Sequence, residues 1–147
     1  MEDTRFLHCN IKTLNLLVNC MAAQKAEAAG CGECVFHRGN IVTECAHSNI
    51  CIIKDGVLKT HPTDNLILPG ITRKHIIQIC NEHQIPVDET AFTMDELLDA
   101  DEVLVSSATK LCVSADELNG VPIGGKAPQI VKIIQDSYME KYINQTK

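Results

Sequence analysis

Residues 49–60 read NICIIKDGVLKT, and this stretch carries a strong signal for a β-hairpin. Asn49–Lys54 is rich in isoleucine, and Val57–Thr60 begins a second short run directly after Asp55 and Gly56. An Asp-Gly pair between two such runs favours a two-residue turn, because both turn positions require a backbone that tolerates positive φ. The stretch therefore predicts two antiparallel strands and makes a β-sheet the centre of the fold.

The segments on either side of this hairpin predict further short strands and several helices. Gly39 and Asn40 separate two strand-like runs and predict a second hairpin, and Asn119-Gly120 marks a third turn. Because strands and helices do not alternate regularly, the order indicates a mixed α/β, or α+β, domain. We expect helices at residues 13–29, 72–83, around 97–98 and from 128 towards 142, and strands at 33–38, 41–45, 49–54, 57–60, 66–68, 85–92, 102–106 and 111–117.

Three helix starts have recognisable chemistry. Thr13 is expected to cap the first helix, Thr93 and Glu96 have the spacing of a capping box, and Pro128 suits the first turn of the last helix. The apolar stripe of the first helix is expected to consist of Leu14, Leu17, Val18 and Met21.

Composition limits the classes of protein that this chain can be. The length of 147 residues suits a single domain spanning residues 1–147, and the hydrophobic fraction of 45% can build a core. A net charge of −6 without any basic cluster disfavours nucleic-acid binding. No apolar run approaches the roughly 18 to 20 residues of a membrane span, and the acidic N-terminus lacks the apolar stretch of a signal peptide. We therefore expect a cytoplasmic protein that binds neither nucleic acid nor membrane.

The eight cysteines allow two interpretations. Because there is no export signal and residues such as Cys51 and Cys80 lie in apolar runs, we expect mostly reduced, buried thiols. Cys31 and Cys34 form a lone CxxC pair, and a structural zinc site needs four ligands. A zinc or thiol protein built on this pair is disfavoured, since only one such pair is present, but it stays open as an alternative.

Two segments contain candidate binding residues. Pro69-Gly70 precedes Thr72 at a predicted helix start, where unpaired backbone N–H groups favour an anion such as phosphate. An ordinary capped helix explains the same residues. Lys12 lies just before another predicted helix; it is either a solvated surface charge or an amine held among apolar groups that can attack a carbonyl. Periodicity does not decide between these interpretations.

Four stretches occur in an order and spacing that resemble a known family. They read HCNIKTLNLL (8–17), VTECAHSN (42–49), NLILPGITR (65–73) and ADEVLVSSAT (100–109). Together they resemble the D-amino-acid type of the class IV, or fold type IV, aminotransferases, which depend on pyridoxal 5'-phosphate (PLP). The resemblance extends from about Thr4 to Tyr142. It implies the C-terminal, PLP-carrying domain of such an enzyme, with a β-meander or barrel-like sheet and flanking helices.

The resemblance also implies a role for individual residues. Lys12 is the lysine that forms the Schiff base with PLP and moves the substrate proton, and Glu44 pairs with the pyridine nitrogen. A carboxylate there keeps the ring nitrogen protonated, so that the ring withdraws electrons. Leu68 packs under the ring. The other implied cofactor-binding residues are His47, Ser48 and Asn49 after the acid, Gly70, Ile71 and Thr72 in the phosphate-binding turn, and Ser107, Ala108 and Thr109 in a second loop.

The implied reaction is transfer of an amino group between a D-amino acid, D-alanine, and a 2-oxo acid such as 2-oxoglutarate. The residues that follow Lys12 resemble those of the D-amino-acid enzymes rather than those of branched-chain aminotransferases. Aminodeoxychorismate lyases share part of this pattern. These lyases and the branched-chain aminotransferases remain the alternatives within the class. Asn10, His47 and Ala108 depart from the usual residues of the family, which leaves the substrate preference open.

The position of the lysine is the largest departure from the family. In these enzymes an N-terminal domain precedes the lysine and supplies an arginine for the phosphate, part of the substrate-carboxylate site and much of the dimer interface. Here only residues 1–11 precede Lys12. We therefore expect a C-terminal half without the N-terminal domain, partnered by a complementary N-terminal chain or by a further copy of itself. Such a half is expected to bind PLP weakly and to turn over slowly or not at all; a non-catalytic PLP-binding or partner-binding domain is the alternative.

Overall fold

The Asp-Gly turn at residues 55–56 closes the predicted hairpin in the middle of the main sheet. In the computed structural model, which describes residues 1–145, β3 (Asn49–Lys54) pairs antiparallel with β4 (Val57–Thr60). Asp55 and Gly56 have φ values of 50° and 78°, as the turn requires. The bounds of both strands match the sequence prediction.

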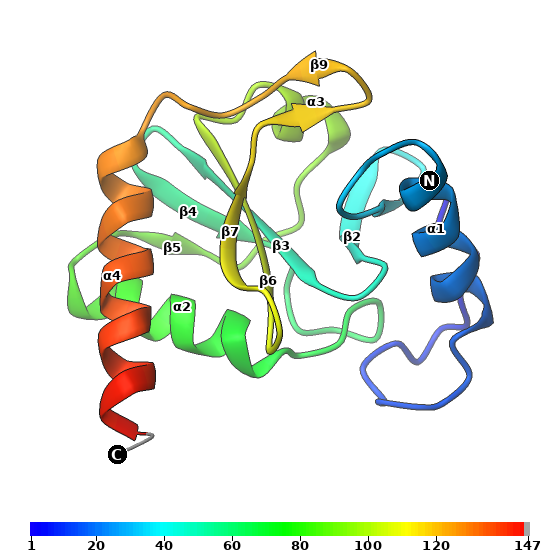
Figure 1. The fold of residues 1–147 in the computed structure, drawn as a ribbon, viewed down its shortest axis with the longest axis horizontal. Helices are drawn as coiled ribbons and strands as arrows, with labels where there is room; N and C mark the ends of the chain where they lie inside the picture. Colours follow the sequence, from blue (N-terminus) through cyan, green and yellow to red (C-terminus); the bar gives the residue numbers. More distant parts are fainter. Residues whose placement is uncertain (146–147) are drawn as a thin grey trace.

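The main sheet has five strands in the order β5-β4-β3-β6-β7. β6 (Glu102–Ser107) pairs antiparallel with β3 and with β7 (Leu111–Ala115), whereas β5 (Val87–Asp88) runs parallel to β4. The mixed α/β class with flanking helices is confirmed (Figure 1). Within residues 1–145 this sheet stays open and does not close into a barrel.

Two smaller hairpins accompany the main sheet. β1 (Val35–Arg38) pairs with β2 (Ile41–Cys45), and β8 (Glu117–Leu118) pairs with β9 (Val121–Pro122). Both turns were predicted from the sequence, and Asn119 carries the positive φ of 50° expected of a residue in a tight hairpin turn. The end of the β1–β2 hairpin, at Glu44 and Cys45, lines a cavity.

Both faces of β3 are buried, and each faces a different core. Cys51 and Ile53 pack with the cluster under α2 (Ile71–Glu82) and α4 (Pro128–Gln145). Ile50 and Ile52 point to the opposite face and pack near α3 (Met94–Leu98). Alternate residues of a strand point to opposite faces, so a strand covered on both sides shows an almost continuous apolar run. Figure 1 shows α2 and α4 on one side of the sheet and α1 (Leu17–Ala28) at the far end of the molecule, beside β2.

The prediction for the first helix was wrong at its start. α1 begins at Leu17, and its N-cap, Leu16, makes no side-chain capping bond. The hydroxyl of Thr13 instead accepts a hydrogen bond from the Asn15 backbone at 3.2 Å and closes a local turn. The expected apolar stripe was wrong for three of its four residues, because Leu14, Leu17 and Met21 are 99%, 69% and 47% exposed. Val18 does pack against the buried cluster beside the helix. The buried residues of the helix are Ala22 and Ala26, and Ala22 packs in a cluster with Phe36 of β1.

Two predicted strands are short or missing because their backbone groups bind elsewhere. The strand expected at residues 85–92 is only Val87–Asp88, since the Asp88 carboxylate accepts the Thr90 N–H in a turn. Residues 66–68 form no strand, because the N–H groups of Leu66 and Leu68 donate to carboxylates instead of a neighbouring strand.

Three other predictions are confirmed. Thr93 and Glu96 form both hydrogen bonds of a capping box, and α4 begins at Pro128. All eight cysteines are free, and five of them are buried.

Among residues 1–145 no three His, Cys, Asp or Glu side chains are grouped so that they could hold a metal ion. Over the same residues, no helix combines the length and the apolar character needed to cross a membrane.

Glu102 fixes the start of α4 from the neighbouring strand. Its buried carboxylate accepts the backbone N–H groups of Gly125 at 3.1 Å and Ala127 at 2.8 Å. We expect Glu102→Ala to lower the free energy of unfolding by about 2 kcal/mol, because both N–H groups lose their acceptor in a partly buried site. Urea unfolding measures this, with Glu140→Ala on the exposed side of α4 as the control. Equal losses in the two variants would contradict this role.

Candidate functional site

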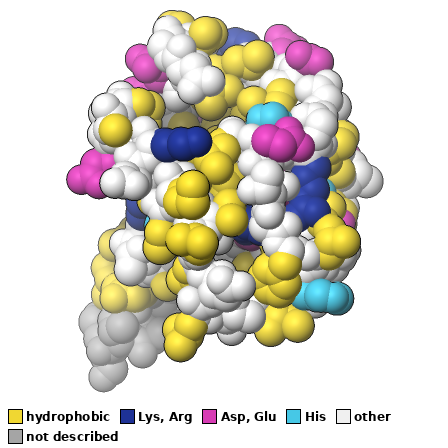
Figure 2. Space-filling model, turned by 90° about the vertical axis from the view of Figure 1, so that its right-hand side faces the viewer, with side chains coloured by type: hydrophobic (Ala, Val, Ile, Leu, Met, Phe, Trp, Pro, Cys, Tyr) yellow, Lys and Arg dark blue, Asp and Glu magenta, His cyan; other side chains and the backbone are white. Residues whose placement is uncertain are grey.

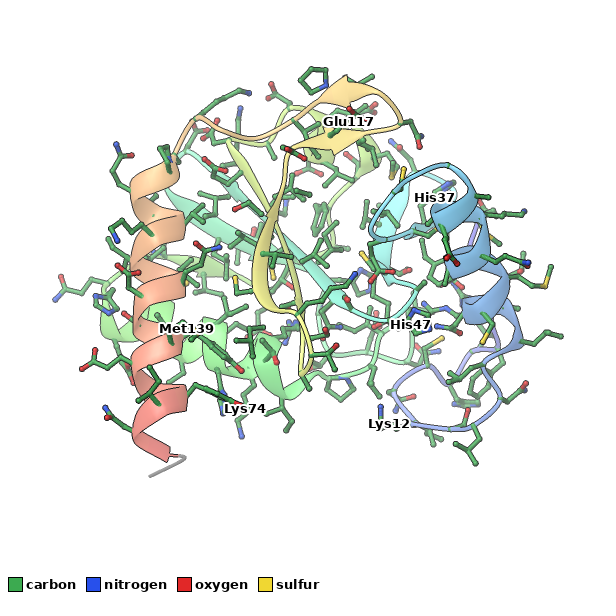
Figure 3. The ribbon with its side chains drawn as sticks, in the orientation of Figure 1. Lys12, His37, His47, Lys74, Glu117 and Met139 are labelled. Carbon is green, nitrogen blue, oxygen red and sulfur yellow. The ribbon has the colours of Figure 1, made fainter. Side chains whose placement is uncertain are left out.

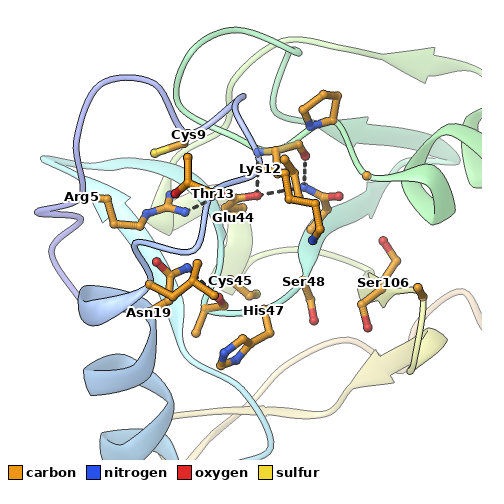
Figure 4. A pocket seen from close by; sticks show the side chains of 18 of the residues that line it. Arg5, Cys9, Lys12, Thr13, Asn19, Glu44, Cys45, His47, Ser48 and Ser106 are labelled. Carbon is orange, nitrogen blue, oxygen red and sulfur yellow. Dashed lines mark hydrogen bonds and ion pairs between the residues drawn. The ribbon is translucent and has the colours of Figure 1, made fainter.

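A cavity of about 610 Å³ lies between the loop before α1, the end of the β1–β2 hairpin, the start of α2 and the turn after β6 (Figure 4). This volume is within the range of roughly 300 to 1,000 Å³ that is usual for small-molecule sites. The cavity brings together every residue of the predicted cofactor site. These are Lys12, Glu44, His47, Ser48, Asn49, Leu68, Gly70, Ile71, Thr72, Ser107, Ala108 and Thr109.

Lys12 lies on a loop that is anchored to the segment before α2. The Cys9 N–H donates to the Asn65 carbonyl at 2.9 Å, and the Ile11 N–H donates to the His8 carbonyl at 3.0 Å. The Lys12 side chain is exposed to the cavity, and within the described part of the chain it forms no hydrogen bond or ion pair. Its amine is therefore free to react with a molecule bound there.

Glu44, the penultimate residue of β2, presents a carboxylate to the same cavity. Its Oε1 accepts a hydrogen bond from Arg5 Nη1 at 2.5 Å. Its Oε2 accepts from Asn49 Nδ2 at 3.1 Å and from the Leu68 N–H at 3.0 Å. A carboxylate has about four acceptor positions, so three protein donors leave one for a donor in the cavity. All three protein partners donate, which favours the ionised form of Glu44.

Burial and charge act in opposite directions on this pair. Burial raises the pKa of Glu44 to about 7, although hydrogen bonding to Arg5 and the charge of Arg5 limit the rise. Burial alone would lower the pKa of Arg5, but its hydrogen bonds to Asp3 and Glu44 outweigh that effect and raise the pKa. The guanidinium therefore stays charged, while Glu44 is poised to exchange a proton near neutral pH.

Arg5 belongs to a buried ionic network that sequence reasoning missed. Its Nε and Nη2 each donate to Asp3 at 2.9 Å, and Arg38 Nε and Thr43 Oγ1 donate to the same carboxylate at 3.2 and 3.1 Å. The guanidinium lies over the Phe36 ring, with its Cζ 4.5 Å from the ring centre. An acid and a base two residues apart near the N-terminus were the only local signal for this network.

Asn49 and Gly70 show how closely the cavity wall is built. Asn49 Nδ2 donates to the Leu68 carbonyl at 2.8 Å as well as to Glu44. A Cβ added at Gly70 would clash with Asn49 Oδ1. Since Asn49 is already fixed by its own hydrogen bonds, only glycine fits at position 70.

The opposite end of the cavity offers donors for an anion. Gly70 is the N-cap of α2, and within residues 1–145 no side-chain hydrogen bond caps that helix start. In the turn after β6, Ser107 Oγ lies 3.3 Å from Thr109 Oγ1 and accepts the Lys110 N–H at 3.1 Å. Ser106 Oγ is buried, lines the cavity and has no hydrogen-bond partner within residues 1–145. A buried hydroxyl without a partner is uncommon in folded proteins, so a water or a bound group is the expected partner of Ser106 Oγ.

The raised pKa of Glu44 predicts a pH-dependent stability. The folded state keeps the Glu44 proton up to about pH 7, whereas the unfolded state releases it near the ordinary value of 4.5. The stability due to this proton is complete below pH 4.5 and is lost as the pH rises to 7. Relative to Glu44→Gln, which cannot ionise, the wild type should lose about 2 to 3 kcal/mol of unfolding free energy between pH 5 and pH 8. Urea unfolding of both proteins across this range tests the prediction. It is contradicted if the unfolding free energy of the wild type, minus that of Glu44→Gln, stays constant or increases as the pH rises.

Comparison with known proteins gives a consistent set of similarities. The sequence pattern of the family described as amino-transferase class IV matches residues 1–118. The chain is 47% identical over 143 residues to a D-alanine aminotransferase of Listeria monocytogenes, covering 97% of this chain and 50% of that protein. It is 44% identical over 144 residues to the D-alanine aminotransferase of Staphylococcus haemolyticus, covering 97% of this chain and 51% of that protein.

Solved structures share the fold. The branched-chain amino acid aminotransferase of Escherichia coli superposes with a TM-score of 0.81 at 27% identity, covering 95% of this chain and 49% of that one. The branched-chain aminotransferase of Thermoproteus uzoniensis superposes with a TM-score of 0.76 at 31% identity, covering 86% of this chain and 43% of that one. The chain spans about half the length of the curated relatives that it matches.

Proposed function

This chain belongs to the class IV aminotransferases, and we propose that its cavity binds PLP and supports transfer of an amino group between D-alanine and a 2-oxo acid such as 2-oxoglutarate. The observation that carries the proposal is the placement of Lys12, Glu44 and an anion-binding end in one cavity. These parts come from segments far apart in the sequence.

The residues present fit PLP at both ends. At one end, the remaining acceptor position of Glu44 suits a protonated ring nitrogen. At the other end, the first turn of α2, with Ile71 and Thr72, suits a phosphate group, because unpaired N–H groups and the helix dipole attract anions. Ser106 Oγ adds a buried hydroxyl that lacks a partner among residues 1–145. Leu68 supplies an apolar wall between the two ends.

PLP, when bound, supplies an aldehyde that a primary amine can attack and a ring that withdraws electrons from the substrate. Lys12 is the residue that would hold the cofactor covalently, because its amine is exposed in the cavity and free of protein partners within the described residues. Once displaced by substrate, the same amine would move a proton at the substrate α-carbon. Both roles need an amine that no protein group holds.

Glu44 would hold a proton at the ring nitrogen. Arg5 and Asn49 fix the orientation of the carboxylate and leave one acceptor position open. A charge-assisted hydrogen bond of this kind is strengthened by burial, since water is largely excluded from the Glu44 side chain. His47 and Ser48 lie in the loop that follows Glu44 and form the wall next to it (Figure 4).

D-Alanine is the substrate that the relatives favour. The similar curated proteins are named D-alanine aminotransferases and are 40 to 47% identical to this chain. The branched-chain aminotransferases are similar in fold but less identical, at 27 to 31% for the two structures above. We therefore propose D-alanine first and keep branched-chain transamination and aminodeoxychorismate lyase activity as the alternatives within the family.

We propose that the cavity is completed by a partner that covers the face around α1. Large apolar side chains are exposed on this face and on the loop before it, including Leu7 at 57%, Leu14 at 99% and Leu17 at 69%. Figure 2 shows apolar side chains gathered on this side of the molecule. The partner we propose is an N-terminal domain equivalent to the other half of the relatives, and a second copy of the chain is the alternative.

Reconstitution tests the proposed function. The purified chain is mixed with PLP and the separately expressed N-terminal half of the Listeria D-alanine aminotransferase, and pyruvate formation from D-alanine and 2-oxoglutarate is measured. We expect pyruvate only when both halves and PLP are present. Activity with L-leucine but not with D-alanine would instead support the branched-chain alternative. PLP binding without turnover of either amino acid would support a non-catalytic domain.

A further inference from the structure

We propose that Glu33 is a positioning residue that ties together two loops of the cavity from behind. The inference rests on the proposed function, because it concerns the phosphate-binding end of the same site. Glu33 does not line the cavity. It lies in the segment between α1 and β1, outside all four stretches that carry the family resemblance.

The Glu33 carboxylate contacts one residue from each loop. Its Oε2 accepts a hydrogen bond from Ser48 Oγ at 2.8 Å and forms an ion pair with Lys110 Nζ at 3.2 Å. Ser48 lines the cavity, and Lys110 directly follows Thr109, which also lines it. A single oxygen atom of Glu33 therefore joins the loop after Glu44 to the turn after β6.

The segment that carries Glu33 is itself held in place. The Glu33 Oε1 accepts the Cys34 N–H at 3.2 Å, and the Cys34 carbonyl accepts the Ala46 N–H at 2.9 Å. Lys110 Nζ also donates to the Gly32 carbonyl at 2.7 Å. The Glu33 side chain is only 12% exposed, so water competes weakly for these contacts.

The turn that Glu33 reaches through Lys110 needs such support. Leu111, the next residue, has a φ of 56°, in the left-handed region that favours glycine. A residue in this conformation is strained and keeps it only when its surroundings hold it there. Lys110 holds the turn on the side away from the cavity, where its ammonium is engaged by Glu33 and Gly32. Ser107, Ala108 and Thr109 are thereby fixed on the cavity side.

Hydrogen exchange of the full chain without PLP tests the tether directly. We expect Glu33→Gln to increase amide exchange at residues 107–111 and 46–48 by about tenfold, because local opening no longer breaks an ion pair. Exchange in β3 and in the paired part of β6 should not change. Glu140→Gln on α4 removes the same charge from an exposed position and is the matched control.

A double-mutant cycle separates a tether from two unrelated effects. Lys110→Met should reproduce the faster exchange of residues 107–111, and adding Glu33→Gln should increase it little further, since the two residues act through one contact. If Glu33→Gln increases exchange throughout the sheet, the exchange of residues 107–111 in Lys110→Met decides on the tether. Lys110 is the more exposed partner, so its replacement disturbs the fold less. Exchange unchanged from the control, or fully additive effects, would overturn the proposal.

Binding of PLP and of pyridoxal, which lacks the phosphate, distinguishes this inference from the proposed function. We expect Glu33→Gln to raise the Kd for PLP by about tenfold and that for pyridoxal by less than about twofold. The absorbance maximum of bound PLP should match the wild type, since Lys12 and Glu44 are unaltered. If wild type binds neither compound, the proposed function fails, while the exchange result still decides on the tether. If wild type binds PLP and the variant binds it equally well, the tether fails and the proposed function stands.

Discussion

Lys12→Ala is expected to abolish amino transfer in the reconstituted enzyme, with a loss of at least about 10³-fold. The physical reason is that no other group in the cavity can serve both as the attachment point for PLP and as the proton carrier at the α-carbon. Lys12 is the only lysine among the residues that line the cavity in the described chain. The measurement is pyruvate formation from D-alanine in the presence of the N-terminal half and PLP, together with the absorbance of bound PLP.

Lys74→Ala is the matched control for this variant. Lys74 lies in the first half of α2, and Figure 3 shows it and Lys12 on different elements, with Lys74 on the helix and Lys12 on the loop before α1. It does not line the cavity. We expect its replacement to leave activity within about twofold of wild type, as for most surface substitutions. Activity retained by Lys12→Ala, or lost in Lys74→Ala, would remove Lys12 from the proposed role.

Arg5→Met should cause the largest loss of stability, about 3 to 5 kcal/mol at pH 7, because it leaves the buried carboxylates of Asp3 and Glu44 without their main partner. The same change should weaken PLP binding, since Glu44 would favour its neutral form and lose its affinity for a protonated ring nitrogen. Urea unfolding and PLP titration measure the two effects. Arg5→Lys keeps the charge but not the forked geometry, so its stability and PLP affinity should lie between those of the wild type and Arg5→Met.

Arg38→Met provides the control within the same network. Arg38 donates to Asp3 at 3.2 Å but forms no bond with Glu44, and its side chain is 23% exposed. We expect a smaller loss of stability and unchanged PLP binding. Equal effects of the Arg5 and Arg38 variants on PLP binding would contradict the special link between Arg5 and Glu44.

Much of the fold was predictable because local chemistry determines it. The Asp-Gly turn at residues 55–56 and the capping box at Thr93 depend on residues a few positions apart. The start of α1 was not predictable in this way. Thr13 could cap a helix or close a turn; in the structure it closes a turn, and the helix packs through Ala22 against Phe36 of β1. The periodicity of the helix sequence does not predict that packing.

Some residues of the candidate site could also be predicted from the sequence, and others could not. Spacing alone left Lys12 as either a surface charge or a reactive amine, and only the resemblance of the surrounding stretches singled it out. The supporting residues were missed because their partners are distant: Arg5 bonds Glu44 across 39 positions, and Glu33 bonds Lys110 across 77. Ser106 was missed because its lack of a partner is a property of the folded wall. Contacts between polar side chains that are far apart in the sequence produce no periodic pattern, so periodicity does not predict them.

The role of Lys12 is tested most directly by identifying the residue that PLP labels. The full chain is incubated with PLP, reduced with borohydride, digested and analysed by mass spectrometry. We expect a single pyridoxyl-phosphate adduct on the peptide that contains Lys12, absent from Lys12→Ala. An adduct mainly on another lysine, or no adduct even with the N-terminal half present, would contradict it.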